Sequence, residues 1–462
     1  MAFADILTNL PEVASPTQKR LSFKEKLKWT LTILVAYYIL GHVPLFGLGA
    51  NALAQFEFLS IILGAKFGSL ISLGIGPIVT ASIVLQLLNG SGIVKFDLTT
   101  HDGKRFFQGL QKLLSIGFII FEAIIYVMMG GLQPSVAVGS PFYTPLVWML
   151  ILQLTIGGLL IMFMDEVVSK WGFGSGLSLF IAAGVSEQIF IRTFSPLTSA
   201  ANPDVAIGAL PAMVQSLARG QPTEAGLLLA GVLATVIVFA MSVYAQAMKV
   251  EIPLSFGRVR GHGIRWPLSF IYTSNIPVIL VAALLANIQL WARLLQNWGH
   301  PFLGTFAGNS PASGLVLWMT PTNMVRAFLT GSMTSAILWH SLAYISFMMI
   351  GCVIFSWFWV QTSGMDARSQ AKQMISSGLQ IPGFRRDERV LERLLERYIG
   401  PLTVMGAIAV GILAAVADIA GALSSGTGIL LAVMIIFKLY EEIAQQHLMD
   451  MNPMMRKFMG KA

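Results

Sequence analysis

The chain has 462 residues and a net charge of +8, with 55% hydrophobic and only 11% charged residues. A soluble domain carries about 25% charged residues, so this composition excludes an ordinary soluble protein and indicates a polytopic membrane protein. The single cysteine, Cys352, excludes a disulfide framework or a cysteine metal cluster within the chain.

The first elements in chain order are a short interfacial helix and a first span. Residues 19–28 are basic but carry Leu21, Phe23 and Leu27, a pattern typical of a helix lying at the membrane surface before Trp29. The charge-free run 29–56 exceeds the roughly 20 residues that a span needs. It lacks the layout of a cleaved signal peptide, so we expect a retained helix.

A broken apolar region follows. The stretch GIGPIVTASIV at residues 74–84 is apolar enough for a span, yet Pro77 stands near its start. The preceding stretch is apolar too, but Gly64, Lys66 and Gly68 interrupt it. Glycine supplies backbone freedom and proline removes a backbone donor, so the joint between the two unequal pieces suits a hinge.

The remaining apolar runs bring the expected number of membrane helices to ten. Two long loops separate later spans, at 249–268 and 361–398. In the second loop Val390, Leu391, Leu394, Leu395 and Tyr398 recur at helical spacing. The ten helices are expected to centre near residues 37, 82, 118, 155, 181, 236, 279, 347, 410 and 436.

Basic residues are distributed unequally between the loops. With ten spans both termini share one side, and that side takes 25 of the 30 lysines and arginines. Positive residues concentrate in cytoplasmic loops, so we expect both termini in the cytoplasm.

A weak internal repeat divides the chain into two halves, 1–222 and 223–462. Pro77 and Pro277 each lie near the start of the second helix of a five-helix half. Inverted repeats with interrupted helices in matching positions often mark a translocation path. Proline is also simply common in membrane helices, so the repeat by itself leaves both interpretations open.

The motifs of catalysis and nucleotide binding are absent. The chain has no HExxH, Walker A or GxGxxG sequence, and its histidines form no pair of metal ligands. We therefore expect no enzyme activity, no metal and no cofactor. Glu122, Glu187 and Asp418 lie within or near spans, but so few carboxylates make a proton-coupled carrier the weaker alternative. The other alternative is an intramembrane hydrolase, but the sequence shows neither the nucleophile nor the metal site that such an enzyme needs.

Five stretches together resemble one family. They are GIGPIVTASIVLQLLNGSGIV (74–94), FQGLQKLLSI (107–116), GSGLSLFIAAGVS (174–186), YTSNIPVIL (272–280) and IPGFRRDERVLE (381–392). In combination they are similar to the SecY family of protein-conducting channels, most closely to its archaeal branch.

The resemblance implies a fold class and a function. The fold would be all-α, with ten transmembrane helices in two pseudo-symmetric inverted halves and a plug half-helix at about 55–68. Such a channel passes secretory polypeptides across the membrane and releases apolar segments sideways into lipid. The alternative is a secondary transporter of a small solute built on the same inverted repeat.

The resemblance also implies partners and a location. The partners would be a SecE-type single-span clamp subunit, a small single-span beta subunit, the ribosome, signal sequences and nascent chains, and membrane lipid. The archaeal plasma membrane is favoured over the endoplasmic reticulum.

Particular residues match the family's functional positions. The pore ring would comprise Ile75, Val79, Phe173, Leu177, Ile279 and Leu431, with Phe173 replacing the usual branched aliphatic residue. The plug would include Glu57, Phe58, Leu59, Ile61, Ile62 and Leu63. A lateral gate would carry Thr80, Gln111 and Asn287, and Arg258, Arg260 and Arg385 would contact the ribosome.

For each set the residues themselves also allow a simpler interpretation. Ring residues could be ordinary packing residues, and the plug a fixed re-entrant helix. Gate residues could be satisfied within their own bundle, and the arginines could be plain cytoplasmic charge.

Overall fold

The computed structural model describes the chain from residue 10 to residue 451, apart from short internal gaps. These gaps are residues 18–20, 52–64, 91–92, 95–100, 129, 138, 200–201, 257–262, 275, 298–299, 308–309, 377–378 and 381–386.

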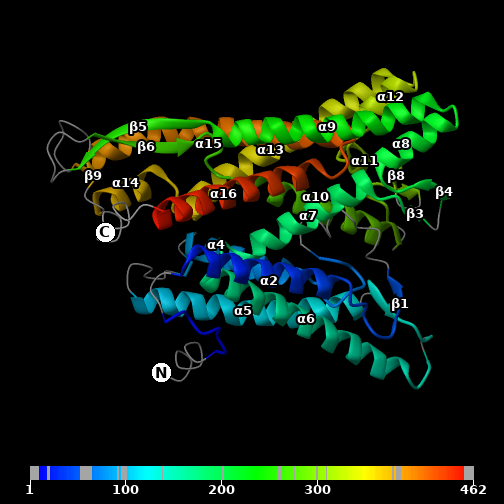
Figure 1. Ribbon diagram of the computed structural model, residues 1–462, viewed down its shortest axis with the longest axis horizontal. Helices are drawn as coiled ribbons and strands as arrows, with labels where there is room; N and C mark the ends of the chain where they lie inside the picture. Colours follow the sequence, from blue (N-terminus) through cyan, green and yellow to red (C-terminus); the bar gives the residue numbers. More distant parts are fainter. Residues whose placement is uncertain are drawn as a thin grey trace. The chain divides into compact units, whose positions relative to one another are not determined.

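Packing divides the chain into two compact units. Unit 1 comprises Met1–Gly184 with Ile435–Ala462, and unit 2 comprises Val185–Met434. The halves 1–222 and 223–462 are predicted from an internal repeat of the sequence. Packing does not test such a repeat, so the two halves stay a prediction. Figure 1 labels the elements of both units.

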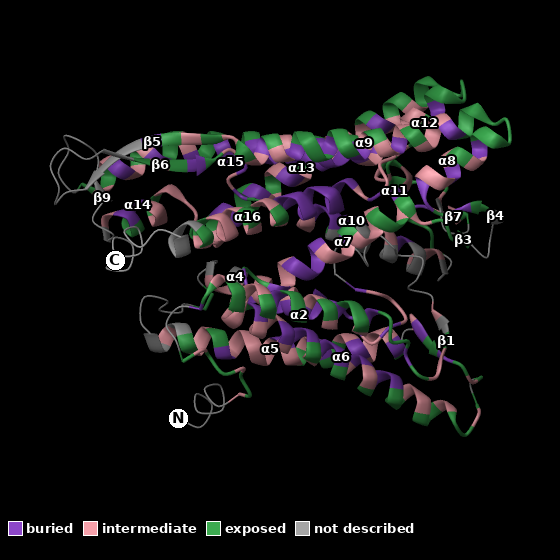
Figure 2. Cartoon of the chain, in the orientation of Figure 1, coloured by how far each residue is buried: buried purple, intermediate pink, exposed green. Residues whose placement is uncertain are grey.

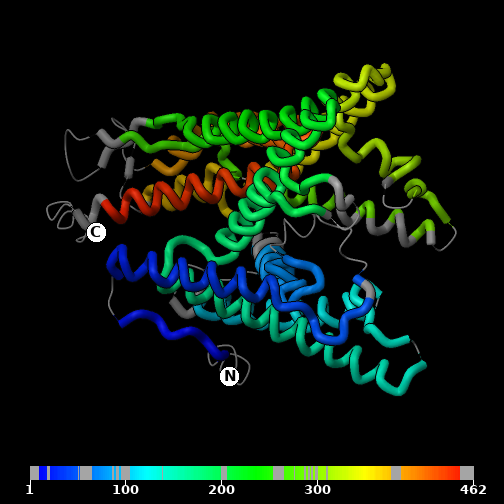
Figure 3. The backbone as a smooth tube through the Cα atoms, turned by 45° about the vertical axis from the view of Figure 1, so that its right-hand side comes forward, coloured from blue at the N-terminus to red at the C-terminus, as the bar shows by residue number. Residues whose placement is uncertain are grey.

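Unit 1 is built from helices with one small two-stranded sheet between its loops. This sheet pairs β1 with β2 in antiparallel fashion. Helix α2 begins with a capping box, in which the Glu25 N–H donates to Ser22 Oγ and the Ser22 N–H donates to the Glu25 carboxylate. Figure 3 shows α2 and α6 running side by side. The elements are α2 (Phe23–Gly41), β1 (Leu48–Asn51), α4 (Gly76–Gly90), α5 (His101–Met128), β2 (Leu132–Pro134), α6 (Tyr143–Trp171), the first part of α7 (Gly176–Phe194) and the last part of α16 (Gly426–Met451).

The joint before α4 is packed and hydrogen-bonded. Residues 71–78 are all buried. The Ser69 hydroxyl donates to the Lys66 carbonyl at 2.7 Å, and the Gly68 N–H donates to Ser72 Oγ at 2.9 Å. Pro77 is the second residue of α4, where the missing N–H costs no helical hydrogen bond. The described part of the predicted Gly-rich hinge is thus packed in this structure, and its swinging stays a prediction.

Unit 2 is a second helical bundle with short strands on its loops. Helices α13 and α15 pack along each other, and a Cβ added at Gly411 would lie 3.1 Å from the Met348 carbonyl oxygen. Small residues of this kind let membrane helices approach closely. The elements are the rest of α7, β3 (Thr198–Ser199), β4 (Asn202–Ala206), α8 (Ala209–Ala218), α9 (Pro222–Ala247), β5 (Lys249–Phe256), β6 (Gly263–Ser269), α10 (Ile276–Asn297), β7 (Phe306–Ala307), β8 (Ser310–Pro311), α11 (Leu315–Trp318), α12 (Met324–Leu329), α13 (Ser335–Thr362), α14 (Ala367–Ser376), β9 (Leu379–Gln380), α15 (Glu388–Ile419) and the start of α16.

The two long loops of unit 2 meet in one small sheet, which sequence analysis did not predict. Strands β5 and β6 pair antiparallel, from Lys249 opposite Ser269 to Ser255 opposite Gly263. Strand β9 of the other loop adds to β5 through Ser255 and Phe256, so the strand order is β6-β5-β9.

The helices agree with the expected positions. Each of the ten predicted centres lies within a helix of the structure. Among the described residues, six helical stretches are both long and apolar enough to cross a membrane. Figure 2 shows many exposed residues on α9, and its Leu233, Val236 and Ile237 are apolar, as expected of a face toward lipid. The all-α class is confirmed, whereas ten membrane crossings stay a prediction.

Candidate functional site

Two predicted ring residues lie at the start of α4 in unit 1. Ile75 is buried with 2% of its surface exposed, and Val79, whose N–H donates to the Ile75 carbonyl at 3.0 Å, is half-buried. A separation of four residues places the two on one helix face. Both side chains are apolar, so this face can contribute to a narrow apolar constriction.

Phe173 and Leu177 stand on either side of the start of α7. The Phe173 ring is 5.5 Å from the Phe23 ring, and the Lys26 ammonium lies 5.6 Å from its centroid. Its N–H donates to Thr30 Oγ1 at 3.0 Å. These contacts give Phe173 a packing role against α2 besides the predicted ring role. Leu177 is half-buried, and its N–H is capped by the Asp165 carboxylate at 3.0 Å.

The other two ring residues belong to unit 2. Ile279 is half-buried near the start of α10, and Leu431 is fully buried in α16. The six positions are thus divided between the two units, and their convergence on one axis stays a prediction.

The predicted gate residues lie on three helices. Thr80 donates its hydroxyl to the Gly76 carbonyl at 2.8 Å within α4, so that group is satisfied in its own helix. Gln111 is half-buried on α5 and lines a polar cavity. Asn287 is in α10, and its side chain is outside the described residues.

Two predicted sets lie outside the part of the chain that the structure describes. The plug residues Glu57, Phe58, Leu59, Ile61, Ile62 and Leu63 fall within the gap 52–64. Arg258 and Arg260 fall within the gap 257–262, and Arg385 falls within the gap 381–386.

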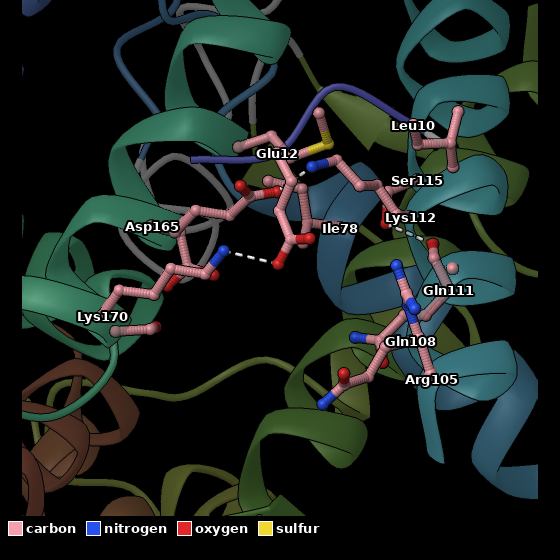
Figure 4. Close-up of a pocket in the computed structure, with 14 residues that line it drawn as sticks. Leu10, Glu12, Ile78, Arg105, Gln108, Gln111, Lys112, Ser115, Asp165 and Lys170 are labelled. Atoms are coloured by element: carbon pink, nitrogen blue, oxygen red, sulfur yellow. Dashed lines mark hydrogen bonds and ion pairs between the residues drawn. The ribbon is translucent and has the colours of Figure 1, made fainter. Parts of the chain in front are cut away.

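The polar cavity is a feature that sequence analysis missed. It has a volume of about 440 Å³ and lies between α5, α6 and the N-terminal segment, within unit 1. Figure 4 shows Lys170 reaching Glu12, and the distance between their charged groups is 2.5 Å. The hydrogen bond from Lys170 lowers the pKa of Glu12 below its usual value of 4.5. Charged residues of both signs line the cavity: Arg105, Lys112, Lys170, Glu12, Asp165 and Glu166.

The two long loops of unit 2 form a second feature, with an apolar core of its own. Ile252 and Leu268 of the hairpin pack against Leu391 and Leu395 of α15, all nearly fully buried. The predicted helical spacing in the loop 361–398 is therefore confirmed, and its apolar face holds the hairpin. The alternation of Val250 and Ile252 with polar residues is the signal that could have predicted the strand.

These features define a class. A mostly helical chain with six helical stretches long and apolar enough to cross a membrane, among the described residues, and with exposed apolar side chains on its helices is a polytopic membrane protein. The family model described as SecY matches residues 69–440. The chain belongs to the SecY family.

Similar proteins support this membership. The protein translocase subunit SecY of Methanothermobacter thermautotrophicus is 47% identical over 462 residues, covering 99% of this chain and 98% of the relative. A solved SecY structure, described as one whose plug domain stabilises the closed state of the translocation channel and maintains a membrane seal, is 42% identical. It has a TM-score of 0.75 and covers 96% of this chain and 97% of that chain. Sec61 in the canine ribosome-channel complex from the endoplasmic reticulum is 41% identical, with a TM-score of 0.76 and the same coverage.

Proposed function

We propose that the chain is the central pore-forming subunit of a protein translocation channel. It passes secretory polypeptides across the membrane and releases apolar segments sideways into lipid. The observation that carries this proposal is the 47% identity to an archaeal translocase subunit over 99% of the chain. A solute carrier is set aside, because the relatives are translocation channels over their full length.

Physical chemistry explains why such a channel needs no catalytic residue. Unpaired peptide groups cost several kcal/mol each in hydrocarbon, so a moving chain needs a watery path. A narrow apolar constriction stops hydrated ions in the idle state, while its side chains part for a polypeptide. Ile75, Val79, Phe173, Leu177, Ile279 and Leu431 form this constriction, and residues 55–68 close it as a plug.

The same function implies a lateral gate, a ribosome-binding surface, partner subunits and a location in the membrane. Thr80, Gln111 and Asn287 hold the lateral gate, and Arg258, Arg260 and Arg385 face ribosomal RNA. A SecE-type clamp subunit and a small beta subunit complete the channel. Both termini lie in the cytoplasm, and the many archaeal relatives favour an archaeal plasma membrane.

The test uses the channel complex reconstituted in liposomes. The parent should protect a secretory precursor from external protease, and replacing Ile75, Val79 and Ile279 by Asn should raise ion leakage about tenfold or more, because polar groups wet the constriction. The matched control replaces the same residues by Leu, Ile and Leu, which keeps the ring apolar. A triple Asn variant that leaks no more than this control contradicts the ring assignment. A parent that protects no precursor contradicts the function.

A further inference from the structure

Helices α5 and α6 are in close contact near the middle of each helix. A Cβ added at Gly158 of α6 would lie 2.7 Å from Ile119 Cγ2 of α5, and Ile119 is fully buried. At this level only the Ile119 side chain lies between the two helices, packed directly against the backbone of Gly158. Ile119 and Gly158 therefore form a close, buried contact between the two helices.

Nearer the start of α5, the two helices are separated by the polar cavity. Its volume of about 440 Å³ means that side chains do not fill this space. Lys112 spans it from α5 and forms an ion pair with Glu166 of α6, with the two side chains only 12% and 18% exposed. The Lys112 ammonium also lies 5.4 Å from the centroid of the Phe163 ring of α6. Lys112 is seven residues from Ile119, or about 10 Å along the helix.

A third segment completes the arrangement. Residues 10–17, here called the strap, cross the end of α6. The Val13 N–H donates to Glu166 Oε2 at 2.9 Å, and Lys170 Nζ donates to the Val13 carbonyl at 2.6 Å. Trp171 Nε1 donates to the Ala14 carbonyl at 2.9 Å. The Glu166 carboxylate is thus shared, with one oxygen on α5 and the other on the strap.

We propose that Glu166 is a positioning residue of the lateral gate: with Lys112 and the strap it forms a latch that holds the inner half of α5 against α6. Gln111, the predicted gate residue of α5, is the direct neighbour of Lys112. Opening the latch lets the inner half of α5 move on the Ile119–Gly158 contact into or away from the cavity, and Gln111 moves with it. This inference rests on the proposed function, because it assigns the latch to gating.

The latch is suited to switching because its groups are charged and largely withdrawn from water. If one member of the ion pair is removed, the other charge remains partly buried without a partner. A state with only one of the two charges in place is therefore unfavourable. The contacts of the strap to α6 are made by its backbone and by Glu12, which remains accessible from the cavity. A partner that displaces residues 12–14 would remove the Val13 donor from Glu166 and weaken the latch.

The experiment measures the separation of α5 and α6 directly. In the full channel complex, with the buried Cys352 changed to Ser, spin labels are attached at Gln108→Cys and Ser169→Cys. Both positions are exposed and line the cavity from opposite helices. Double electron–electron resonance then gives the distance distribution between the two labels.

Three variants and one control decide the result. Lys112→Met and Glu166→Gln should each raise the population of shifted distances about tenfold, the ratio expected for losing a partly buried charged hydrogen bond. Lys112→Arg, which keeps the charge, should behave as the parent. Glu251→Gln, which breaks the exposed Arg265–Glu251 pair of unit 2, should change nothing. Parent-like distributions in both Lys112→Met and Glu166→Gln overturn the latch.

Ion leakage in liposomes separates the gate role from a merely structural one. Lys112→Met should raise leakage and admit precursors with defective signal sequences, whereas Lys112→Arg should not. A shifted distance with parent-like leakage overturns the positioning role. Protection of the precursor by the parent channel is a separate measurement, so the proposed function stands or fails independently of the latch.

Discussion

The hydroxyl of Tyr272 donates a hydrogen bond of 2.7 Å to the backbone carbonyl of Met365. Tyr272 follows strand β6, and Met365 lies between α13 and α14, so one bond joins the two long loops at their bases. The same loops share the apolar core of Ile252, Leu391 and Leu395. The two loops therefore form one folded body rather than two independent connections.

Replacing Tyr272 by Phe should loosen this body. The Met365 carbonyl loses its donor, and we expect a loss of about 1 kcal/mol in the local stability of the β5–β6 hairpin. Amide hydrogen exchange of β5 and β6 measures the change. Tyr398→Phe is the matched control, since that hydroxyl has no partner among the described residues. Equal exchange in both variants would show that the bond contributes nothing.

The same residue predicts a pH dependence. Burial raises the pKa of Tyr272 to about 12, and the nearby charge of Asp366 adds to the rise. Because the folded pKa lies above the unfolded value of about 10, the neutral phenol stabilises the body fully below pH ~10 and progressively less as the pH rises to ~12. The tyrosinate absorbance of the parent minus that of Tyr272→Phe should show a midpoint near the raised value. A midpoint near 10 would contradict burial as the cause.

Asp418 joins three helices of unit 2. Its Oδ2 accepts a hydrogen bond from the Tyr344 hydroxyl at 2.8 Å, and its Oδ1 accepts one from the Gly426 N–H at 2.7 Å. Asp418→Ala leaves both donors without a partner and should cost about 1–3 kcal/mol, with Asp418→Asn costing less because its oxygen still accepts. Thermal unfolding of the complex in detergent measures the order of stability of the parent and the two variants. Tyr440→Phe, on an exposed side chain, serves as control, and an Asn variant as unstable as the Ala variant would refute the capping role.

The arginine prediction concerns the ribosome. Changing Arg258, Arg260 and Arg385 to Glu should weaken binding of purified ribosomes, and the slope of log affinity against log salt should fall by roughly one for each lost phosphate contact. Changing Arg219 and Arg326, on the predicted outer side, should leave binding unchanged. A triple variant with parent affinity across a salt series would assign the three arginines to membrane orientation only.

The plug prediction is sharpened by the packed joint before α4. Residues 71–78 are buried and the Ser69 hydroxyl donates to the Lys66 carbonyl, so this joint anchors the chain that follows the predicted plug. Deleting residues 57–63 spares this joint, and should leave a folded channel that opens intermittently in conductance recordings. Moving the plug from mostly closed to mostly open requires about 5.5 kcal/mol of differential binding, which an arriving signal helix must supply.

Crosslinking tests the movement itself. With Cys352 changed to Ser, a cysteine at Phe58 should crosslink to the outer end of the clamp subunit only while a chain is arrested in the pore. If an arrested chain leaves the position 58 cysteine crosslinking to the ring as in the idle channel, residues 55–68 are a fixed packing helix.

The sequence by itself determined the class, the family and the places of the helices. Each apolar run of span length is one continuous stretch of sequence, which is why each of the ten predicted centres lies in a helix. The placement of Pro77 and Pro277 near helix starts was equally local, and both occupy the second position of their helices. The stretches that resemble SecY proteins are also continuous in the sequence, so they identified the family without the structure.

Only the tertiary structure decided which distant groups meet. Lys112 and Glu166 are 54 positions apart, Val13 and Glu166 are 153 apart, and Tyr272 and Met365 are 93 apart. Spacing along one helix says which face a residue occupies, but not which other helix approaches that face, or where two helices part around a cavity. The Lys112–Glu166 pair, the contacts of the strap and the joining of the two long loops follow from that packing, because a hydrogen bond or ion pair forms only within a few ångström of its partner.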